Sequence, residues 1–291
     1  MAGSIAERMV DRVEHAHQLD GAVGLVRSAW STVLKAPKVR DLLSGRSIGH
    51  PLHPIAVQVA AGLLASSTVL DLVGDQDGEA AGTLLTLGLV AAVPTAAAGW
   101  ADWIDTEDAE SRVGLVHASA NALAIAAYLL SWRQRRRGRS GRAAGLTGAA
   151  TMAVGGYLGG HLAFAQGVGV DTTAFQAVPT DWTVVGPAAD VTAALHQVRV
   201  NGLPVLLTRV DGQIVALADR CTHRGAPLSD GTRDETGCVV CPWHNSRFDL
   251  RTGQVERGPA TRPQPAFEVR ERDGNVEIRR QEVRALRVNP V

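Results

Sequence analysis

The chain has 291 residues, enough for one large domain or two ordinary ones. Its 29 basic and 29 acidic residues balance, so charge gives no reason to expect nucleic acid as a partner. The averages conceal a division, because residues 54–164 are dominated by Ala, Leu, Val and Gly, whereas the segments on either side are rich in Arg, Asp and Glu. The middle of the chain is therefore expected to lie in a different solvent from the rest.

Residues 1–50 have the pattern of amphipathic helices. Ile5, Met9 and Val13 recur at helical spacing, and Pro37 interrupts the pattern further along. We expect this segment to lie along a membrane surface, and it contains no pattern typical of a chemical site.

Residues 51–170 contain four apolar runs, each close to the roughly 20 residues that a helix needs to cross about 30 Å of hydrocarbon. The runs are residues 55–73, 80–100, 113–132 and 143–164. A soluble bundle of buried helices is the alternative, but the near absence of charge inside four successive runs favours a four-helix transmembrane bundle. The chain is thus expected to be a multi-pass protein of the cell membrane.

Two patterns in these runs bear on packing and orientation. Gly155 with Gly159, and Gly156 with Gly160, form small-xxx-small pairs that predict close helix contact. Six Arg within residues 133–142 favour a cytoplasmic position for that loop by the positive-inside rule. Basic residues on the opposite side balance this count, so the rule leaves the side of the C-terminal domain open. Those residues are Lys35, Lys38, Arg40, Arg46 and Arg112.

Residues 180–281 change to short alternating runs separated by turn residues. Runs at 205–210 and 213–217 flank Asp211-Gly212, and runs at 266–271 and 276–280 flank residues 273–275. An Asp-Gly pair between alternating runs is a strong hairpin signal. The sequence therefore predicts a small antiparallel β domain, followed by a tail over 282–291, and so an α + β chain whose two classes occupy separate domains.

Two loops of the β domain each offer one thiol and one imidazole. Cys221 and His223 stand two residues apart, and Cys241 and His244 stand three apart, with 17 residues between the pairs. Thiolates suit iron in a cluster, and neutral imidazoles in place of two thiolates make the site less negative and raise its potential. Structural zinc also accepts two Cys and two His, but a Cys-x-His spacing is unlike that of a usual zinc finger.

The residues around these ligands closely resemble the Rieske family. The likeness covers residues 181–280 and includes Cys-Thr-His-Arg-Gly from Cys221 and Cys-Pro-Trp-His-Asn-Ser-Arg-Phe-Asp from Cys241. The resemblance implies a [2Fe-2S] cluster in which Cys221 and Cys241 ligate one iron, while His223 and His244 ligate the other at the tip of the domain.

The resemblance also marks departures from the Rieske subunits of cytochrome bc complexes. Those subunits join their cluster loops by a disulfide, but Ala226 and Trp243 occupy the matching positions here. Ser246 matches a hydroxyl that bonds a cluster sulfur and raises the potential, while Phe248 replaces a second hydroxyl. We therefore expect a potential inside the span of roughly −150 to +300 mV for such centres and away from both limits. Cys238 is interpreted as a small buried side chain.

The membrane segment carries a second resemblance, to a bacterial four-helix membrane family of unestablished function. It rests on Gly-His-Pro-Leu-His-Pro from Gly49 and on short segments near the other helix ends. Four crossings would place several polar residues on the same face of the membrane. They are His50, His53, Asp102, His117 and His161. Polar groups at membrane depth tend to mark function, so this face could form a quinone, haem or metal site; interfacial histidines bonded to backbone or water are the alternative.

The leading functional interpretation is a membrane-anchored Rieske electron-transfer protein that serves a redox protein partner or a quinone in the lipid bilayer. A quinone- or haem-linked membrane oxidoreductase that uses the histidine-rich face is the first alternative. A redox-sensing regulatory module is the second. A Rieske oxygenase is disfavoured, because it would need a further domain with a 2-His-1-carboxylate iron site.

Overall fold

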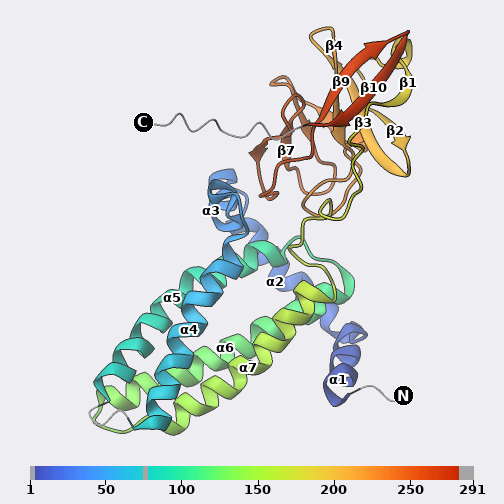
Figure 1. Ribbon diagram of the computed structural model, residues 1–291. Helices are drawn as coiled ribbons and strands as arrows, with labels where there is room; N and C mark the ends of the chain where they lie inside the picture. The colour runs from blue at the N-terminus through green and yellow to red at the C-terminus, as the bar shows by residue number, and fades with distance from the viewer. Residues whose placement is uncertain (1–3, 75–77, 282–291) are drawn as a thin grey trace, which may run out of the picture. The chain divides into compact units, whose positions relative to one another are not determined.

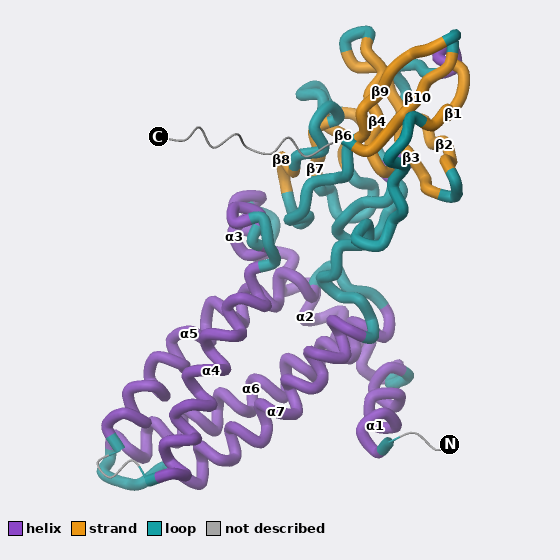
Figure 2. The backbone as a smooth tube through the Cα atoms, viewed as in Figure 1, coloured by secondary structure: helices purple, strands orange, loops and turns teal. Residues whose placement is uncertain are grey.

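The computed structural model describes residues 4–74 and 78–281. The chain divides into two compact units, Met1–Val170 and Asp171–Val291. The first unit is built from helices, and the second is built from β-strands and loops (Figure 1, Figure 2). The predicted fold class, helices followed by an antiparallel β domain, is confirmed.

The N-terminal segment is helical, as its periodicity predicts. It forms α1 (Ile5–Glu14), α2 (Asp20–Val33) and α3 (Pro37–Ser44). Ser4 and Glu7 make a capping box that satisfies amide groups at the start of α1. Val10 of α1 is buried against Val113 and Leu158 of the long helices. This segment is therefore packed on the helical unit, and its position along a membrane surface stays a prediction.

Four long helices follow, and each contains one of the predicted apolar runs. They are α4 (Leu52–Val73), α5 (Glu79–Trp103), α6 (Asp108–Arg136) and α7 (Arg142–Phe164). Within the described residues, α4, α5 and α6 are long and apolar enough to cross a membrane. With 23 residues, α7 would reach about 35 Å at 1.5 Å per residue, and its crossing stays a prediction.

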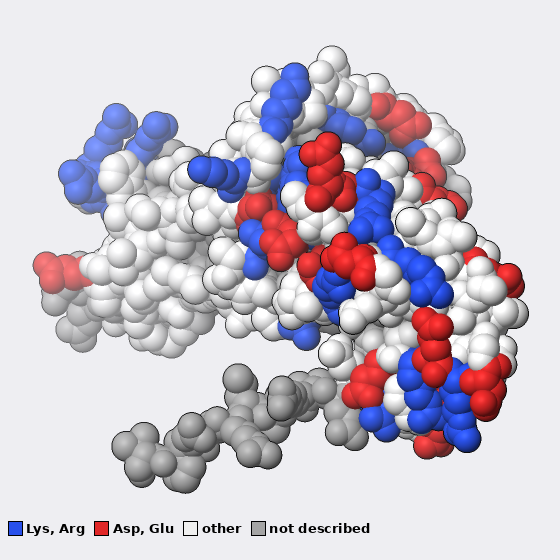
Figure 3. Space-filling view, turned by 90° about the horizontal axis from the view of Figure 1, so that it is seen from above, with Lys and Arg blue, Asp and Glu red and all other residues white. Residues whose placement is uncertain are grey.

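The long helices direct large apolar side chains outward. Val73 is 74 % exposed, Val93 71 % and Leu123 66 %. Exposed apolar surface on this scale indicates an interaction with a partner or a membrane. In the space-filling view, blue and red alternate over the β unit, whereas a long stretch of the visible helical surface is white (Figure 3). These features agree with helices that are solvated by lipid.

The four long helices form two copies of one helical hairpin, α4–α5 and α6–α7. In the first, the Ser67 hydroxyl donates a hydrogen bond to the Ala81 carbonyl at 2.7 Å. In the second, the Ser131 hydroxyl donates to the Gly141 carbonyl at 2.8 Å. These bonds define a register in which α4 residues match α6 residues 64 positions later and α5 residues match α7 residues 60 positions later.

Helix contacts follow the same register. A Cβ on Gly88 would lie 2.8 Å from the Leu64 side chain, and a Cβ on Gly148 would lie 2.8 Å from the Tyr128 ring, at the matching positions. Residues matched by the register also contact each other, because Arg135 donates a hydrogen bond to Asp71 at 2.5 Å. Contact between equivalent positions is the mark of a two-fold relation. The helical unit therefore has internal two-fold pseudosymmetry, which the sequence patterns did not predict.

Over the residues that the structure describes, the β unit forms three antiparallel sheets. One has the order β1 (Thr183–Pro187), β10 (Asn275–Arg280), β9 (Phe267–Arg272). A second has the order β2 (His196–Val200), β3 (Leu203–Val210), β4 (Gln213–Ala218). The third follows chain order through β5 (Thr232–Arg233), β6 (Cys238–Val240), β7 (Arg247–Asp249) and β8 (Val255–Arg257).

Both predicted hairpins are present. Asp211 and Gly212 have φ values of 50° and 79°, and β3 pairs with β4 from Val210 opposite Gln213. The β9–β10 turn repeats this backbone at residues 273–274, with φ values of 49° and 76°. Positive φ at both central residues matches the twist of the flanking strands, which explains why Asp-Gly was a reliable signal.

Two apolar cores lie in the described part of the β unit. The first lies among the strands of the first two sheets and contains Val205 and Ile278, both fully buried. The second surrounds the cysteine loops and contains Phe248, Cys221 and Cys241. The predicted ligand loops are therefore anchored in a core of their own.

Candidate metal centre

The two Cys/His loops leave strands of the β unit at different points. Cys221 and His223 follow β4, whereas Cys241 and His244 lie between β6 and β7. Between the two loops in the chain, β5 pairs with β6, and β6 then pairs with β7 across the second loop. The β5–β6 hairpin thus occupies the 17-residue separation between the pairs, and the β6–β7 pair fixes the second loop.

The two loops share one backbone geometry. The Cys221 amide donates to the Ala226 carbonyl at 2.8 Å, and the Gly225 amide donates back to the Cys221 carbonyl at 2.9 Å. In the second loop, the same two bonds join Cys241 to the residues four and five positions later, at 3.1 and 2.8 Å. The fourth position needs positive φ, which Gly225 supplies at 81° and Asn245 at 60°, the residue types that tolerate it best.

Both thiols are buried and lie next to each other. Cys221 and Cys241 are each 1 % exposed. The pKa of Cys221 is raised well above its usual value, chiefly by a hydrogen bond between the two thiols and next by burial. Two adjacent buried thiols are a poor arrangement for free thiolates and a suitable one for a positively charged metal, which deprotonates its thiol ligands.

The two imidazoles also lie next to each other. The rings of His223 and His244 have centroids 5.0 Å apart and stand at 88° to one another. The Nδ1 atom of each ring is buried, while each residue as a whole is half-buried. Each ring therefore turns one nitrogen inward and leaves part of its edge at the surface. Trp243, beside His244, is 55 % exposed.

The four side chains do not surround a single point. Ligands of one tetrahedral zinc lie about 2.0–2.3 Å from the ion and hence within about 4 Å of each other. Among the residues that the structure describes, only one group of three His, Cys, Asp or Glu side chains has ligand atoms that all lie within 4.8 Å of one another. It consists of Asp11, Glu14 and His15, on and just beyond α1. The spread of the loop ligands argues against structural zinc and suits a group with two metal ions.

A buried glutamine that sequence reasoning missed supports the first loop. Gln264, 1 % exposed, donates through Nε2 to the carbonyls of Ala218 at 2.6 Å and Arg220 at 2.7 Å. Its Oε1 accepts a hydrogen bond from the Thr222 amide at 3.2 Å. One side chain thus satisfies three backbone groups on both sides of Cys221. No spacing rule relates this residue to the ligand motif.

Two further residues that the sequence did not single out hold the same loop. Asp219 is 1 % exposed and accepts hydrogen bonds from the Ser229 amide at 2.6 Å and the Ser229 hydroxyl at 2.9 Å. The Thr172 hydroxyl donates to the Cys221 carbonyl at 2.7 Å. Thr172 lies before the predicted domain start, so the segment that leads into the β domain also supports the loop.

Three neighbours of the ligands are buried. Ser246 is fully buried, and its hydroxyl oxygen accepts a hydrogen bond from the Ala260 amide at 3.0 Å. Phe248 is fully buried in the core around the loops. Cys238 is 3 % exposed, which agrees with its interpretation as a small buried side chain. Ala226 is buried and Trp243 exposed where the disulfide of bc-type subunits would lie.

The structure brings together two of the five polar residues predicted for the membrane face. The rings of His53 and His117 have centroids 6.5 Å apart. His161 instead contacts Glu14 of α1, with 2.8 Å between His161 Nε2 and Glu14 Oε1. His50 is exposed and Asp102 is half-buried near the end of α5.

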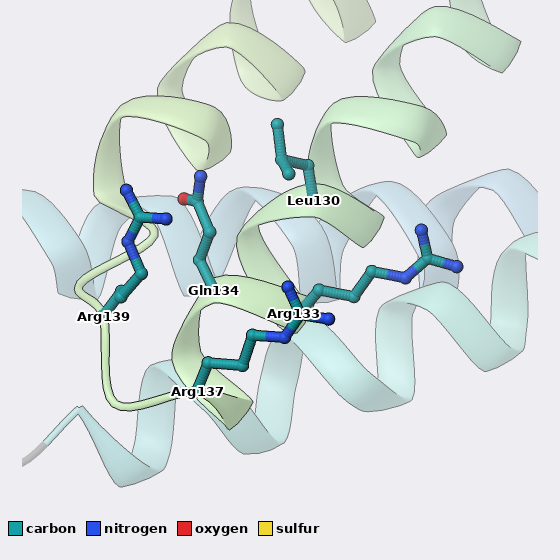
Figure 4. A pocket seen from close by; sticks show the side chains of 5 residues that line it. All are labelled: Leu130, Arg133, Gln134, Arg137 and Arg139. Carbon is teal, nitrogen blue, oxygen red and sulfur yellow. The ribbon is translucent and has the colours of Figure 1, made fainter.

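The arginine-rich segment 133–142, which begins in the last turn of α6, is only partly available as free charge. Arg135 pairs with Asp71, whose side chain is 4 % exposed. Arg133, Arg137 and Arg139 line an open groove with Leu130 and Gln134 (Figure 4). One of the six arginines counted for orientation is therefore neutralised inside the helical unit.

Comparison with known families assigns both units. Residues 181–268 match the family described as Rieske [2Fe-2S] domain. Residues 49–172 match the family described as Predicted membrane protein (DUF2231). Both resemblances drawn from sequence motifs are confirmed.

Individual relatives match the β unit. The chain is 34 % identical over 104 residues to the anthranilate 1,2-dioxygenase ferredoxin subunit of Burkholderia cepacia, covering 35 % of this chain and 95 % of the relative. It is 38 % identical over 100 residues to ferredoxin CarAc of Metapseudomonas resinovorans, covering 33 % and 92 %. A solved complex of reduced oxygenase and oxidized ferredoxin in carbazole 1,9a-dioxygenase matches at 36 % identity and a TM-score of 0.31, covering 34 % of this chain and 92 % of that one.

Proposed function

The chain belongs to the Rieske [2Fe-2S] family, and from this premise we propose that it is a membrane-anchored carrier that passes single electrons between a redox partner protein and an acceptor at the membrane. The observation that carries the proposal is the pair of matching loops, which bury two adjacent thiols and set two imidazoles 5.0 Å apart, edge to face. A bound [2Fe-2S] cluster supplies reversible electron transfer at a potential set by its surroundings.

We assign the ligands by residue type and burial. Cys221 and Cys241, fully buried and adjacent, hold one iron. His223 and His244 hold the other through their buried Nδ1 atoms. This division leaves the outer edges of both rings half-exposed beside the exposed Trp243, which forms a suitable surface for a redox partner. One relative named above is a dioxygenase ferredoxin subunit, so an oxygenase-type protein is one class of partner.

Ser246 is the residue of this chain best placed to tune the cluster. Its oxygen accepts a hydrogen bond from the Ala260 amide, so its own hydroxyl proton remains available for a hydrogen bond to a second acceptor. A hydrogen bond from this hydroxyl to a cluster sulfur would raise the potential. Phe248 offers no second hydroxyl, so we retain a potential between the limits of roughly −150 and +300 mV for such centres.

The helical unit supplies the anchor. Three of its helices are long and apolar enough to cross a membrane, and their outward faces are apolar. We propose that α7 completes four crossings, which returns the chain to the side on which it began. That arrangement places the N-terminal segment and the β unit on the same side of the membrane.

One experiment addresses the cluster and the membrane topology together. Electron paramagnetic resonance of the reduced protein in sealed membrane vesicles should show a Rieske signal, and a protease added outside should remove that signal in vesicles of one orientation only. Loss in both orientations, or no Rieske signal, would contradict the proposal.

The ligand assignment has a matched control in the third cysteine. Cys221→Ser and Cys241→Ser should each reduce cluster iron from two per chain to near zero. Cys238→Ser should retain both irons, because Cys238 is buried three residues before Cys241 without being a ligand. Equal loss in all three variants would show that the thiols serve only folding.

A second candidate function is a haem- or quinone-linked membrane oxidoreductase. The contact between His53 and His117 is the observation that favours it. A redox-sensing module is separated from both by purification, since a sensor would copurify with a regulatory partner instead of exchanging electrons with a reductase or a quinol.

A further inference from the structure

His53 and His117 occupy equivalent positions in the two helical hairpins, 64 residues apart as the register requires. The Nδ1 atom of His53 lies 2.9 Å from the Thr95 carbonyl oxygen on α5. The Nδ1 atom of His117 lies 2.7 Å from the Gly155 carbonyl oxygen on α7, again at the matching position. The same contact is therefore built twice.

A glycine four residues after each carbonyl makes room for the ring. A Cβ on Gly99 would lie 2.8 Å from Cε1 of His53, and a Cβ on Gly159 would lie 2.9 Å from Cε1 of His117. Any other residue at these positions would have to displace the imidazole. Gly155 and Gly159, one of the two small-xxx-small pairs, thus receive side chains from α6, while Gly156 and Gly160 face open space.

These contacts determine the tautomer of both rings. A carbonyl oxygen only accepts hydrogen bonds, so Nδ1 carries the proton in each neutral imidazole and Nε2 carries the lone pair. A backbone carbonyl on Nδ1–H is the arrangement that orients a metal-binding histidine and makes its Nε2 a better ligand. Each hairpin thereby presents one fixed ring whose Nε2 atom carries a lone pair.

The two rings meet between the hairpins. Their centroids are 6.5 Å apart, and their planes are at 88°. Imidazole nitrogen binds a transition metal at about 2.0–2.1 Å, so two imidazoles on opposite sides of one metal have centroids roughly 6 Å apart. Because His53 and His117 are equivalent residues in contact, they lie near the pseudo-two-fold axis, where one ion can be shared by both halves.

We propose that His53 and His117 bind one transition metal through their Nε2 atoms at the pseudo-two-fold axis of the helical unit. The metal is either the iron of a haem or a single ion such as copper, zinc or cobalt, since both are bound by neutral imidazole. This site is separate from the [2Fe-2S] ligands, all of which belong to the β unit.

Asn121 adds a polar group on one side of this pair. Its amide nitrogen donates to the His117 carbonyl at 2.9 Å and lies 3.3 Å from His117 Nε2. A donor near Nε2 agrees with a lone pair on that atom. The register matches Asn121 with Val57, so the two halves differ here, and Asn121 could contact a bound group from the α6 side only.

The first test measures metal in the purified full-length protein in detergent. We expect one equivalent of haem, by pyridine haemochrome, or one equivalent of a non-cluster metal, by mass spectrometry. If the protein is isolated without it, titration with haemin, Cu²⁺, Zn²⁺ and Co²⁺ should reveal one saturable site. His53→Gln and His117→Gln should each weaken binding at least tenfold, whereas His50→Gln should not, because His50 is exposed and outside the pair.

The second test keeps both ligands and moves the rings. Gly99→Ala and Gly159→Ala place a methyl group against the imidazole and should weaken binding at least tenfold. Gly156→Ala and Gly160→Ala are matched controls on α7, since a Cβ there meets nothing within 4 Å, and they should bind as the wild type does. The Rieske signal should persist in every variant and reports that the β unit is folded.

The proposal is overturned if the wild type contains no such metal and binds none of the four probes saturably. It is also overturned if both histidine variants bind as the wild type does. In either case the rings serve only as hydrogen bonds between helices. Neither result alters the cluster assignment, because the Rieske signal is measured independently.

Discussion

Replacement of Gln264 by Leu tests how the first cluster loop is held. Gln264 is buried and makes three hydrogen bonds to backbone groups on both sides of Cys221. Leucine removes all three bonds and fills a similar volume. A buried hydrogen bond contributes about 1 kcal/mol, and a buried group left without a partner costs about 1–3 kcal/mol. We therefore expect a loss of at least about 3 kcal/mol in the free energy of unfolding of the β unit.

The loss should appear as a lower midpoint for thermal release of the cluster, followed by visible circular dichroism of the full-length protein. At roughly 4 °C per kcal/mol for a domain of about this size, the midpoint should fall by about 12 °C or more. Gln213→Leu is the control, because Gln213 is exposed at the start of β4. A fall in Gln264→Leu no larger than in this control would refute the idea that Gln264 holds the loop.

Three further changes probe other parts of the molecule. Ser246→Ala should lower the reduction potential in a redox titration and cost about 1–3 kcal/mol, since the Ala260 amide loses its acceptor; an unchanged potential would remove Ser246 from the tuning argument. Asp71→Asn should destabilise the helical unit by about 3 kcal/mol by leaving the Arg135 guanidinium buried without its carboxylate, and Asp71→Asn with Arg135→Gln should recover much of that loss in detergent unfolding. A hydrogen bond from Arg112 lowers the pKa of Asp20, so this carboxylate stabilises the fold above its unfolded pKa of about 3.8, and the stabilisation disappears as pH falls through the lower folded pKa. Asp20→Asn should therefore lower the thermal midpoint at pH 6, and its effect should shrink as the pH falls through the lowered pKa of Asp20.

The arrangement of elements could be predicted because local signals were strong. Each apolar run lies within one of the helices α4–α7, and both hairpins turn at the expected residues. The helices extend beyond the apolar runs because polar residues can form their ends: Glu107 and Glu110 form a capping box before α6. The ligand motif was equally informative, since its Cys, His and turn residues all fall within two short segments.

The supporting residues could not be predicted, because their partners are distant in the sequence. Gln264 contacts backbone groups more than 40 residues away, and an isolated glutamine between two prolines has no pattern that predicts burial. Glu14 is separated from His161 by almost the whole helical unit. Only the three-dimensional packing brings these groups together. The predicted face of five polar residues therefore resolves into one histidine pair and separate contacts for the others.

The internal repeat was missed because the two hairpins share few identities, although their spacings agree. His53 precedes Ser67 by the same interval that separates His117 from Ser131, and Gly88 precedes Gly99 as Gly148 precedes Gly159. The shared positions are those that bond or contact the neighbouring helix. The outward positions carry different apolar residues in the two hairpins. A search for spaced polar and glycine positions would find this repeat where a search for identity would not.

Both candidate metal sites lie where two copies of one structural motif, a loop or a helical hairpin, meet. In the β unit, two loops with the same hydrogen bonds bring Cys221 and Cys241 together. In the helical unit, two hairpins with the same contacts bring His53 and His117 together. Because the supporting contacts are repeated, each ligand is positioned by its own loop or hairpin. The pair of ligands then forms when the two loops, or the two hairpins, pack against each other. A substitution that displaces one ring, such as Gly99→Ala, should therefore weaken metal binding even though the other hairpin keeps its contacts.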